Sequence, residues 1–196
     1  MSMERKTRIV IIDQNPVRRA ILEEGLREAG HDDIVHLSDT ENLLQRVVAI
    51  DPDVIVVDLE SPSRDVLEQM FQMSRAVPRP VAMFVDQSDT AMINAAIDAG
   101  VSAYVVDGLR KERVKPILDM CVSRFNAFAR LKDELEQAKS QLAERKVIDR
   151  AKAILMKAKS IGEDEAYGLL RKAAMNEKKK LSEIAQAVVT AAELLR

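Results

Sequence analysis

The chain has 196 residues, which is enough for one domain of ordinary size and a small second one. Hydrophobic residues make up 47 % and charged residues 32 %, a balance typical of a soluble globular protein, and no window is long and apolar enough to span a membrane. Residues 1–120 hold 14 Lys and Arg against 21 Asp and Glu, whereas residues 121–196 hold 16 against 11, so the net charges are −7 and +5. This asymmetry predicts that only the C-terminal part approaches a polyanion.

The N-terminal residues 1–8 lack the apolar core of a signal peptide, and the single cysteine, Cys121, has no partner for an internal disulfide. We therefore expect a cytoplasmic protein in which Cys121 is a small core residue. The sequence also contains no glycine-rich phosphate loop and no Cys/His spacing typical of a metal site, so we do not expect an enzyme.

Short apolar runs alternate with stretches of helical periodicity along the first part of the chain. The apolar runs cover residues 8–12, 34–37, 54–57, 81–85 and 103–106. The helical stretches cover residues 17–29, 41–49, 66–76 and a segment that ends at Ala99-Gly100. Continuous apolar runs of this length are typical of strands buried on both faces, so the pattern predicts an α/β fold with five parallel strands and helices on both sides of the sheet.

Polar side chains follow two of these strands. Asp13 and Gln14 come after the first strand and Asp58 after the third. In open parallel sheets, ligands gather at the carboxyl ends of the strands. Paired carboxylates can hold Mg²⁺, and a single Asp can act as a nucleophile, so this edge suits a hard cation and a phosphoryl group.

The block Asp51-Pro-Asp-Val-Ile-Val-Val-Asp58, together with Asp98-Ala-Gly100 and Tyr104, resembles the response-regulator receiver domain over roughly residues 8–120. The resemblance implies a flavodoxin-like fold. It also implies that Asp58 is the phosphoacceptor, that Asp13 and Asp58 belong to a Mg²⁺ site, and that Tyr104 is the rotating aromatic residue. No cofactor is expected to be required, although Mg²⁺ is possible at these two carboxylates.

Three positions depart from the receiver pattern. Gln14 replaces a second acid, Val85 occupies the position of the usual Ser or Thr, and Asp107 occupies that of the usual Lys. A carboxylate at the position of a cation repels a phosphoryl group. We therefore expect the receiver to work mainly as a protein-binding surface, with phosphorylation of Asp58 as the alternative.

A long helix is predicted to follow, because residues 114–156 contain no Gly and Pro116 lies where the first turn of a helix tolerates it. Apolar residues then recur at the spacing of a short heptad seam, formed by Phe128, Leu131, Leu135, Ala138 and Leu142. A stripe this narrow favours self-association into a homodimer, and the alternative is that it packs on the receiver.

Three blocks of helical periodicity with basic outer faces end the chain. They are Val147-Ile-Asp-Arg-Ala-Lys-Ala-Ile-Leu-Met156, residues 164–175 and residues 178–185. The acidic turn at residues 163–165 favours a helix N-terminus there. The apolar face that the second helix turns to the core of this unit is predicted to consist of Ala166, Leu169, Leu170 and Ala173. The pattern predicts a small three-helix unit.

The order of these blocks over about residues 140–195 resembles the ANTAR domain, an RNA-binding module of bacterial transcription antiterminators. The resemblance implies recognition of paired short RNA hairpins, whose exposed loop bases can be read by stacking and hydrogen bonds. The cationic candidates for RNA contact are Arg145, Lys146, Arg150, Lys152, Lys157, Lys159, Arg171, Lys172, Lys178, Lys179 and Lys180. Tyr167 is the aromatic candidate for base stacking.

The two resemblances together identify the chain as similar to ANTAR response regulators of the nitrate-assimilation (NasT) and aliphatic-amidase types. They predict a receiver or pseudo-receiver domain (1–120), a coiled-coil linker (121–143) and an ANTAR domain (144–196). The implied partners are leader mRNA hairpins and a sensor protein that sequesters the regulator, with no membrane contact. The alternatives are a DNA-binding regulator, in which Leu181-Ser-Glu-Ile-Ala-Gln-Ala opens a helix-turn-helix, and a non-catalytic protein adaptor.

Overall fold

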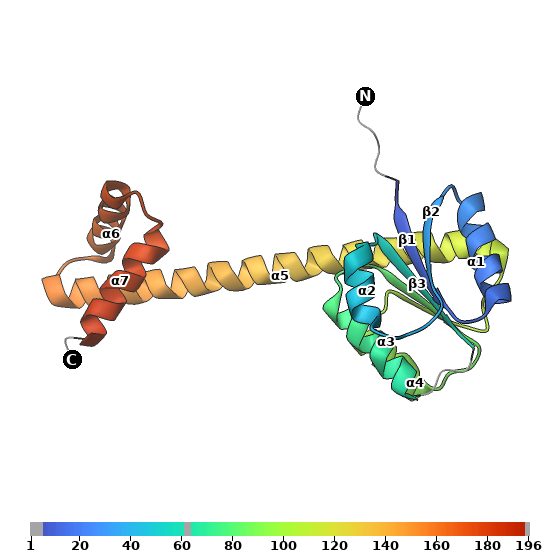
Figure 1. The fold of residues 1–196 in the computed structure, drawn as a ribbon. Coiled ribbons are helices and arrows are strands. Elements are labelled where there is room, and N and C mark those ends of the chain that lie inside the picture. The colour runs from blue at the N-terminus through green and yellow to red at the C-terminus, as the bar shows by residue number, and fades with distance from the viewer. Residues whose placement is uncertain (1–5, 61–63, 195–196) are drawn as a thin grey trace, which may run out of the picture. The chain divides into compact units, whose positions relative to one another are not determined.

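The computed structural model describes residues 6–60 and 64–194 (Figure 1). Its first part is built on a parallel sheet with the strand order β2-β1-β3-β4-β5, which is the flavodoxin-like order. The strands are β1 (Arg8–Asp13), β2 (Asp33–Leu37), β3 (Val54–Leu59), β4 (Val81–Val85) and β5 (Ala103–Val106). The prediction of a five-stranded parallel sheet is therefore confirmed.

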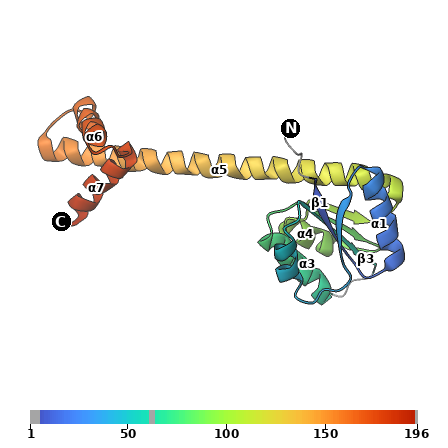
Figure 2. The same ribbon diagram turned by 45° about the horizontal axis from the view of Figure 1, so that its top comes forward.

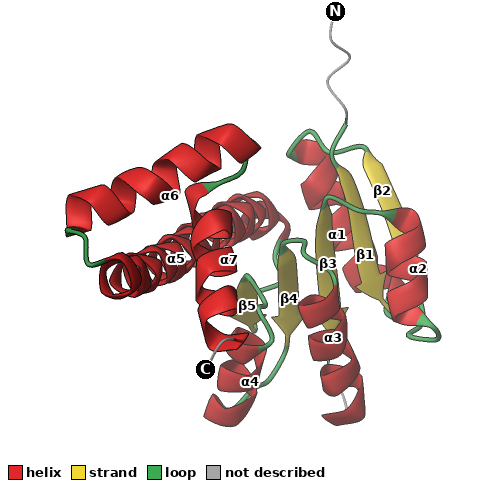
Figure 3. Cartoon of the chain, turned by 90° about the vertical axis from the view of Figure 1, so that its left-hand side faces the viewer, coloured by secondary structure: helices red, strands yellow, loops and turns green. Residues whose placement is uncertain are grey.

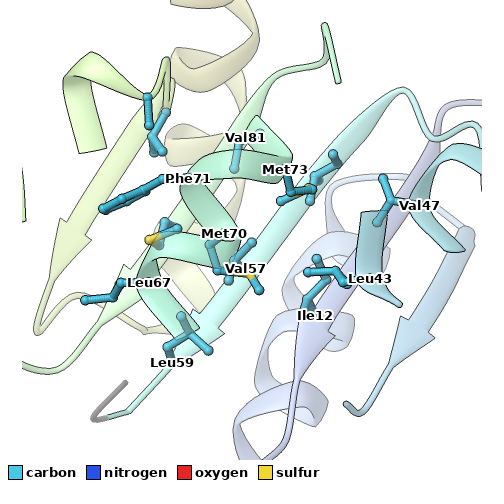
Figure 4. Packing of buried hydrophobic residues seen from close by; sticks show 14 of the residues in the cluster. Ile12, Leu43, Val47, Val57, Leu59, Leu67, Met70, Phe71, Met73 and Val81 are labelled. Atoms are coloured by element: carbon cyan, nitrogen blue, oxygen red, sulfur yellow. The ribbon is translucent and has the colours of Figure 1, made fainter. Parts of the chain in front are cut away.

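Helices cover both faces of this sheet (Figure 3). The helices between the strands are α1 (Pro16–Glu28), α2 (Leu43–Ile50), α3 (Arg64–Ala76) and α4 (Thr90–Asp98). Side chains alternate between the faces of a strand, so Ile9 and Ile11 pack with α1, whereas Val10 and Ile12 pack with α2 and α3. Figure 4 shows the second of these cores, with Met70 and Phe71 of α3 lying over the sheet.

The helix after β5 is a single element of 49 residues, α5 (Lys111–Lys159) (Figure 2). Its first turns are buried against the sheet through Val114, Leu118 and Cys121, which confirms that the cysteine is a core residue. Burial raises the pKa of the Cys121 thiol to about 12, so the thiol stays neutral. Pro116 lies inside the helix and not in its first turn as expected, because α5 begins three residues before Val114.

The C-terminal helices α6 (Glu163–Glu177) and α7 (Leu181–Leu194) pack with the last turns of α5 around a small apolar core. Ala151, Ala166 and Ala185 are fully buried in it, because small side chains allow the helix axes to approach closely. The prediction of a three-helix unit is confirmed. The assignment of Leu169 to its core is wrong: Leu169 is 39 % exposed, and Ala174 is buried on that face instead.

The chain divides into two compact units, Met1–Ala129 and Arg130–Arg196. The first unit is the sheet with its helices and the start of α5. The second contains the rest of α5 with α6 and α7. Among the described residues, no helix combines the length and apolar character that crossing a membrane demands.

Candidate functional site

Acidic side chains meet at the carboxyl edge of the sheet, as predicted. Asp13 ends β1 and lies directly opposite Asp58 in the register of the neighbouring β3. Both residues are buried, each with 2 % of its surface exposed. Glu60, which follows β3, and Asp86, which follows β4, add two further carboxylates at this edge.

The loop after β1 places a cation among these acids. Asn15 caps α1, because its side chain accepts hydrogen bonds from the backbone N–H groups of Val17 and Arg18. Pro16 occupies the first helical position, which its fixed φ and missing N–H suit. Arg18 therefore lies in the first turn of α1, beside the ends of β1 and β3.

The Arg18 guanidinium binds two carboxylates at once. Its Nε and Nη2 donate to Oδ2 and Oδ1 of Asp58, each at 2.7 Å, so both oxygens of Asp58 are engaged. Its Nη1 donates to Oδ1 of Asp86, also at 2.7 Å. The side chain of Asp58 is completely buried and that of Arg18 is 18 % exposed, whereas Asp86 is half-exposed. Bidentate pairing of this kind is the geometry in which a guanidinium binds a carboxylate most strongly.

Asp13 lacks such a partner. Its Oδ1 accepts a hydrogen bond of 2.7 Å from the backbone N–H of Asn15, but its Oδ2 is buried and has no hydrogen-bond partner within the described chain. Burial raises the pKa of Asp13 to about 6, and the charge of Asp58 contributes in the same direction. Burial also raises the pKa of Asp58, although Arg18 opposes that change.

Mg²⁺, which the receiver pattern implies, is bound in proteins by one or two carboxylates and several waters in an octahedral arrangement. Here Asp58 has both oxygens engaged by Arg18, which leaves Asp13 Oδ2 as the free acceptor of the predicted pair. Over residues 6–60 and 64–194, no group of three or more His, Cys, Asp or Glu could hold a metal ion. The residues do not fit Mg²⁺ while the guanidinium holds Asp58.

The three departures from the receiver pattern lie around this edge. Val85 is buried at the end of β4 and offers no hydroxyl, and Gln14 is exposed. Asp107 is exposed and has a left-handed backbone, with φ at 47°. Tyr104 is half-buried, and its hydroxyl lies 2.9 Å from Oγ of Ser88. The cation of this site therefore comes from α1 and not from the loop after β5.

Sequence reasoning missed Arg18 and Asp86. Asp58 lies 40 residues after Arg18 in the sequence, and Asp86 lies 68 residues after it. Local periodicity cannot reveal ion pairs between positions so far apart. One signal was available in the sequence. The helix dipole disfavours a cation in the first turn of a helix, and Arg18 follows closely on the helix start at Asn15 and Pro16. A cation at this position indicates that acidic partners lie nearby.

The predicted seam residues lie along the middle of α5 and point to solvent within the single chain. Phe128 is 72 % exposed, and Leu131 and Leu135 are more than half exposed. Leu142 is more than half exposed as well, and Ala138 is exposed. Within the described residues, the stripe is therefore far more exposed to solvent than the side chains of a hydrophobic core.

Some of the predicted cations of the C-terminal unit are engaged within the unit itself. Arg150 on α5 donates to Glu193 on α7 at 2.6 Å, which links these helices. Lys152, with a side chain only 16 % exposed, contacts Asp149 at 2.7 Å and Glu163 on α6 at 2.6 Å. Lys179 pairs with Glu177, and Arg145 lies 4.0 Å from Asp149. These ion pairs raise the pKa of Lys152 and lower that of Asp149.

The remaining predicted cations are exposed and form no ion pair with the described part of the chain. They are Lys146, Lys157, Lys159, Arg171, Lys172, Lys178 and Lys180. Tyr167, 43 % exposed, lies one helical turn before Arg171 on α6. Gly168 lies one turn before Lys172, and a Cβ added there would meet open space. This outer face of α6, formed by Tyr167, Gly168, Arg171 and Lys172, is called the α6 face below.

Comparison with known proteins agrees with both resemblances. The family model described as "Response regulator receiver domain" matches residues 9–119, and the model described as "ANTAR domain" matches residues 136–189. The chain is 25 % identical over 182 residues to "Transcriptional regulatory protein PdtaR" of Mycobacterium tuberculosis, which covers 93 % of this chain and 89 % of that protein.

Two further likenesses concern parts of the chain. "Nitrate regulatory protein" of Klebsiella oxytoca is 34 % identical over 82 residues, which is 42 % of this chain and 21 % of that protein. A response regulator from Thermotoga maritima has the same fold, with a TM-score of 0.52 and 16 % identity over 60 % of this chain and 98 % of that one. The chain thus belongs to the response regulator receiver family and carries an ANTAR domain after its receiver domain.

Proposed function

We propose that this protein is an RNA-binding transcription antitermination regulator. Its ANTAR domain binds paired hairpins in leader RNA, and its receiver domain places that activity under the control of a sensor protein. The observation that carries the proposal is the α6 face, where two cations without an ion-pair partner among the described residues lie one helical turn from an exposed aromatic ring, on a domain of the ANTAR family.

The α6 face combines the two kinds of group that bind a single-stranded RNA loop. Arg171 and Lys172 have no acidic partner among the described residues, so contact with phosphate costs no internal ion pair. The Tyr167 ring and the Arg171 guanidinium plane can each stack on a base. Gly168 leaves the helix surface between them open, although glycine inside a helix costs about 0.5–1 kcal/mol relative to Ala. A close approach of RNA at this point would account for that cost.

The state of the acidic edge supports control by a sensor protein. Phosphorylation would require the Asp58 carboxylate as a nucleophile, but both of its oxygens are held by Arg18. Val85 and Asp107 offer neither the hydroxyl nor the cation that would stabilise a phosphoryl group. A surface that binds another protein needs none of these groups.

A homodimer would match the paired hairpins. The exposed stripe of Phe128, Leu131, Leu135 and Leu142 on α5 has the spacing of a two-stranded coiled coil. Two chains joined in this way present two ANTAR domains, so the second hairpin binds intramolecularly and at a high effective concentration.

The test is RNA binding by the full-length protein over a range of salt concentrations, with a two-hairpin leader RNA and a duplex DNA competitor. We expect the logarithm of the affinity to fall with the logarithm of salt by about 0.7 for each phosphate contacted on single strands. Arg171→Gln with Lys172→Gln should lower this slope by about 1.4, and Tyr167→Ala should weaken binding by about 1–3 kcal/mol with little change in slope.

Matched control variants distinguish the effect of the α6 face from the effect of losing positive charge anywhere on the protein. Arg110→Gln with Arg113→Gln removes the same charge from two exposed positions of the receiver unit and should leave the RNA affinity within about twofold. Lys152→Gln removes a cation that is already paired with Asp149 and Glu163, so the salt slope should stay unchanged. Equal competition by duplex DNA at every salt concentration would overturn the proposal.

A further inference from the structure

The carboxyl edge of the receiver unit contains a positive charge of its own. In the described chain, Arg18 reaches from the first turn of α1 to Asp58 on β3 and to Asp86 beyond β4, with three hydrogen bonds of 2.7 Å. The neighbouring Asp13, buried opposite Asp58, has one oxygen that accepts no hydrogen bond from the described residues. Within the described residues, the Arg18 guanidinium is the one cationic group in ion-pair contact with Asp58.

We propose that Arg18 is the resident cation of this edge and takes the place of a divalent ion. The guanidinium neutralises Asp58 and uses both of the oxygens through which Asp58 would ligate a metal. Within the described residues, Asp13 then offers one free oxygen, and this oxygen lies beside a guanidinium whose positive charge repels a divalent ion. The acidic edge is thereby held in a metal-independent state by a side chain of the same domain.

The local structure explains why Arg18 stays in this position. The Asn15 cap and Pro16 fix the first turn of α1, and Asn15 also donates to Glu60 through its side-chain amide. Asp86 binds the guanidinium nitrogen that Asp58 leaves free. Asp58 and Asp86 therefore hold the guanidinium from two sides, and a divalent ion would have to displace it from a bidentate pair in a buried environment.

The inference can be tested by titrating the full-length protein with MgCl₂ at constant ionic strength while following the backbone amide signals of Asp13, Asp58 and Asp86 by NMR. We expect no saturable change at Asp58 in the wild type. In Arg18→Ala, the two carboxylates become free, and Mg²⁺ affinity should rise at least about tenfold, because a charge that repels the ion has been removed. Asp58→Asn in the Arg18→Ala background should abolish this gain.

Arg19→Ala is the matched control, because it removes a neighbouring cation that forms no ion pair with the described residues. It should bind Mg²⁺ as weakly as the wild type. Saturable binding at Asp58 in the wild type, or a folded Arg18→Ala variant that still fails to bind Mg²⁺, would show that Arg18 does not exclude the metal.

A second measurement needs no variant and decides the matter if Arg18→Ala does not fold. The Nε–H signal of Arg18, assigned through its own side-chain carbons, should be protected from solvent exchange and should not move on addition of Mg²⁺. If Mg²⁺ shifts this signal and removes its protection, the guanidinium is displaceable and the proposal fails. RNA binding is not part of either readout, so these outcomes are independent of the function proposed above.

Discussion

Removing Arg18 should destabilise the receiver unit far more than removing the carboxylate it binds. Arg18→Ala leaves the carboxylate of Asp58, whose side chain is completely buried, without a cation. Breaking a buried pair in this way costs about 3–5 kcal/mol, and proton uptake by Asp58 places the expected loss near the lower figure, about 3 kcal/mol at neutral pH. Asp58→Ala instead leaves Arg18 bound to the half-exposed Asp86 and in contact with water, so about 1 kcal/mol is expected.

Urea unfolding provides the assay. The chain has no Trp and two Tyr, so a Tyr167→Phe background leaves Tyr104, in the receiver unit, as the sole tyrosine fluorophore. Arg19→Ala serves as the control and should change the free energy of unfolding by about 0.5 kcal/mol or less. In the double variant of Arg18→Ala and Asp58→Ala, the loss should be smaller than the sum of the single losses by about 2 kcal/mol. Equal losses for the two single variants, or additive losses in the double variant, would refute the reasoning.

Two further predictions concern Asp13 and the α5 stripe. Because the folded pKa of Asp13 lies above its unfolded value, the folded state binds more protons between about pH 4 and about pH 6, so the free energy of unfolding should fall by about 3 kcal/mol as pH rises through this window. Asp13→Asn should flatten that fall in urea titrations, and an unchanged slope would contradict it. Leu135→Lys with Leu142→Lys should yield a monomer by light scattering and should lose a preference of about 100-fold for two-hairpin over single-hairpin RNA. A variant that stays dimeric would show that the stripe is not the interface.

The sheet could be predicted because its strands are buried on both faces. The run at residues 54–57, for example, is continuous in Val and Ile, and all of β3 (Val54–Leu59) is buried in the structure. The same reasoning failed at Leu169, where helical periodicity alone could not decide between two adjacent apolar positions. Leu170 and Ala174 lie toward α5 and α7, and Leu169 lies beside them with more than a third of its surface exposed.

The candidate site was predictable only in part, for a physical reason. The acids follow strands, and parallel strands bring their carboxyl ends to one edge, so Asp13 and Asp58 could be placed together. The partner of Asp58 comes from a helix, and the direction in which a helical side chain points depends on how the helix begins. The Asn15 cap and Pro16 fix that direction for Arg18. The pattern of apolar residues along the sequence does not reveal the direction in which the Arg18 side chain points.

The two units differ in whether their cations are paired, and this difference affects where a polyanion can bind. At the carboxyl edge of the receiver, the cation is consumed by Asp58 and Asp86, so an approaching phosphate meets excess negative charge. In the ANTAR unit, the pairs made by Arg150 and Lys152 join helices, and the cations of the α6 face remain available. The internal pairs remove equal numbers of both signs, so the net charge of +5 over residues 121–196 is left to cations that are free to meet a polyanion.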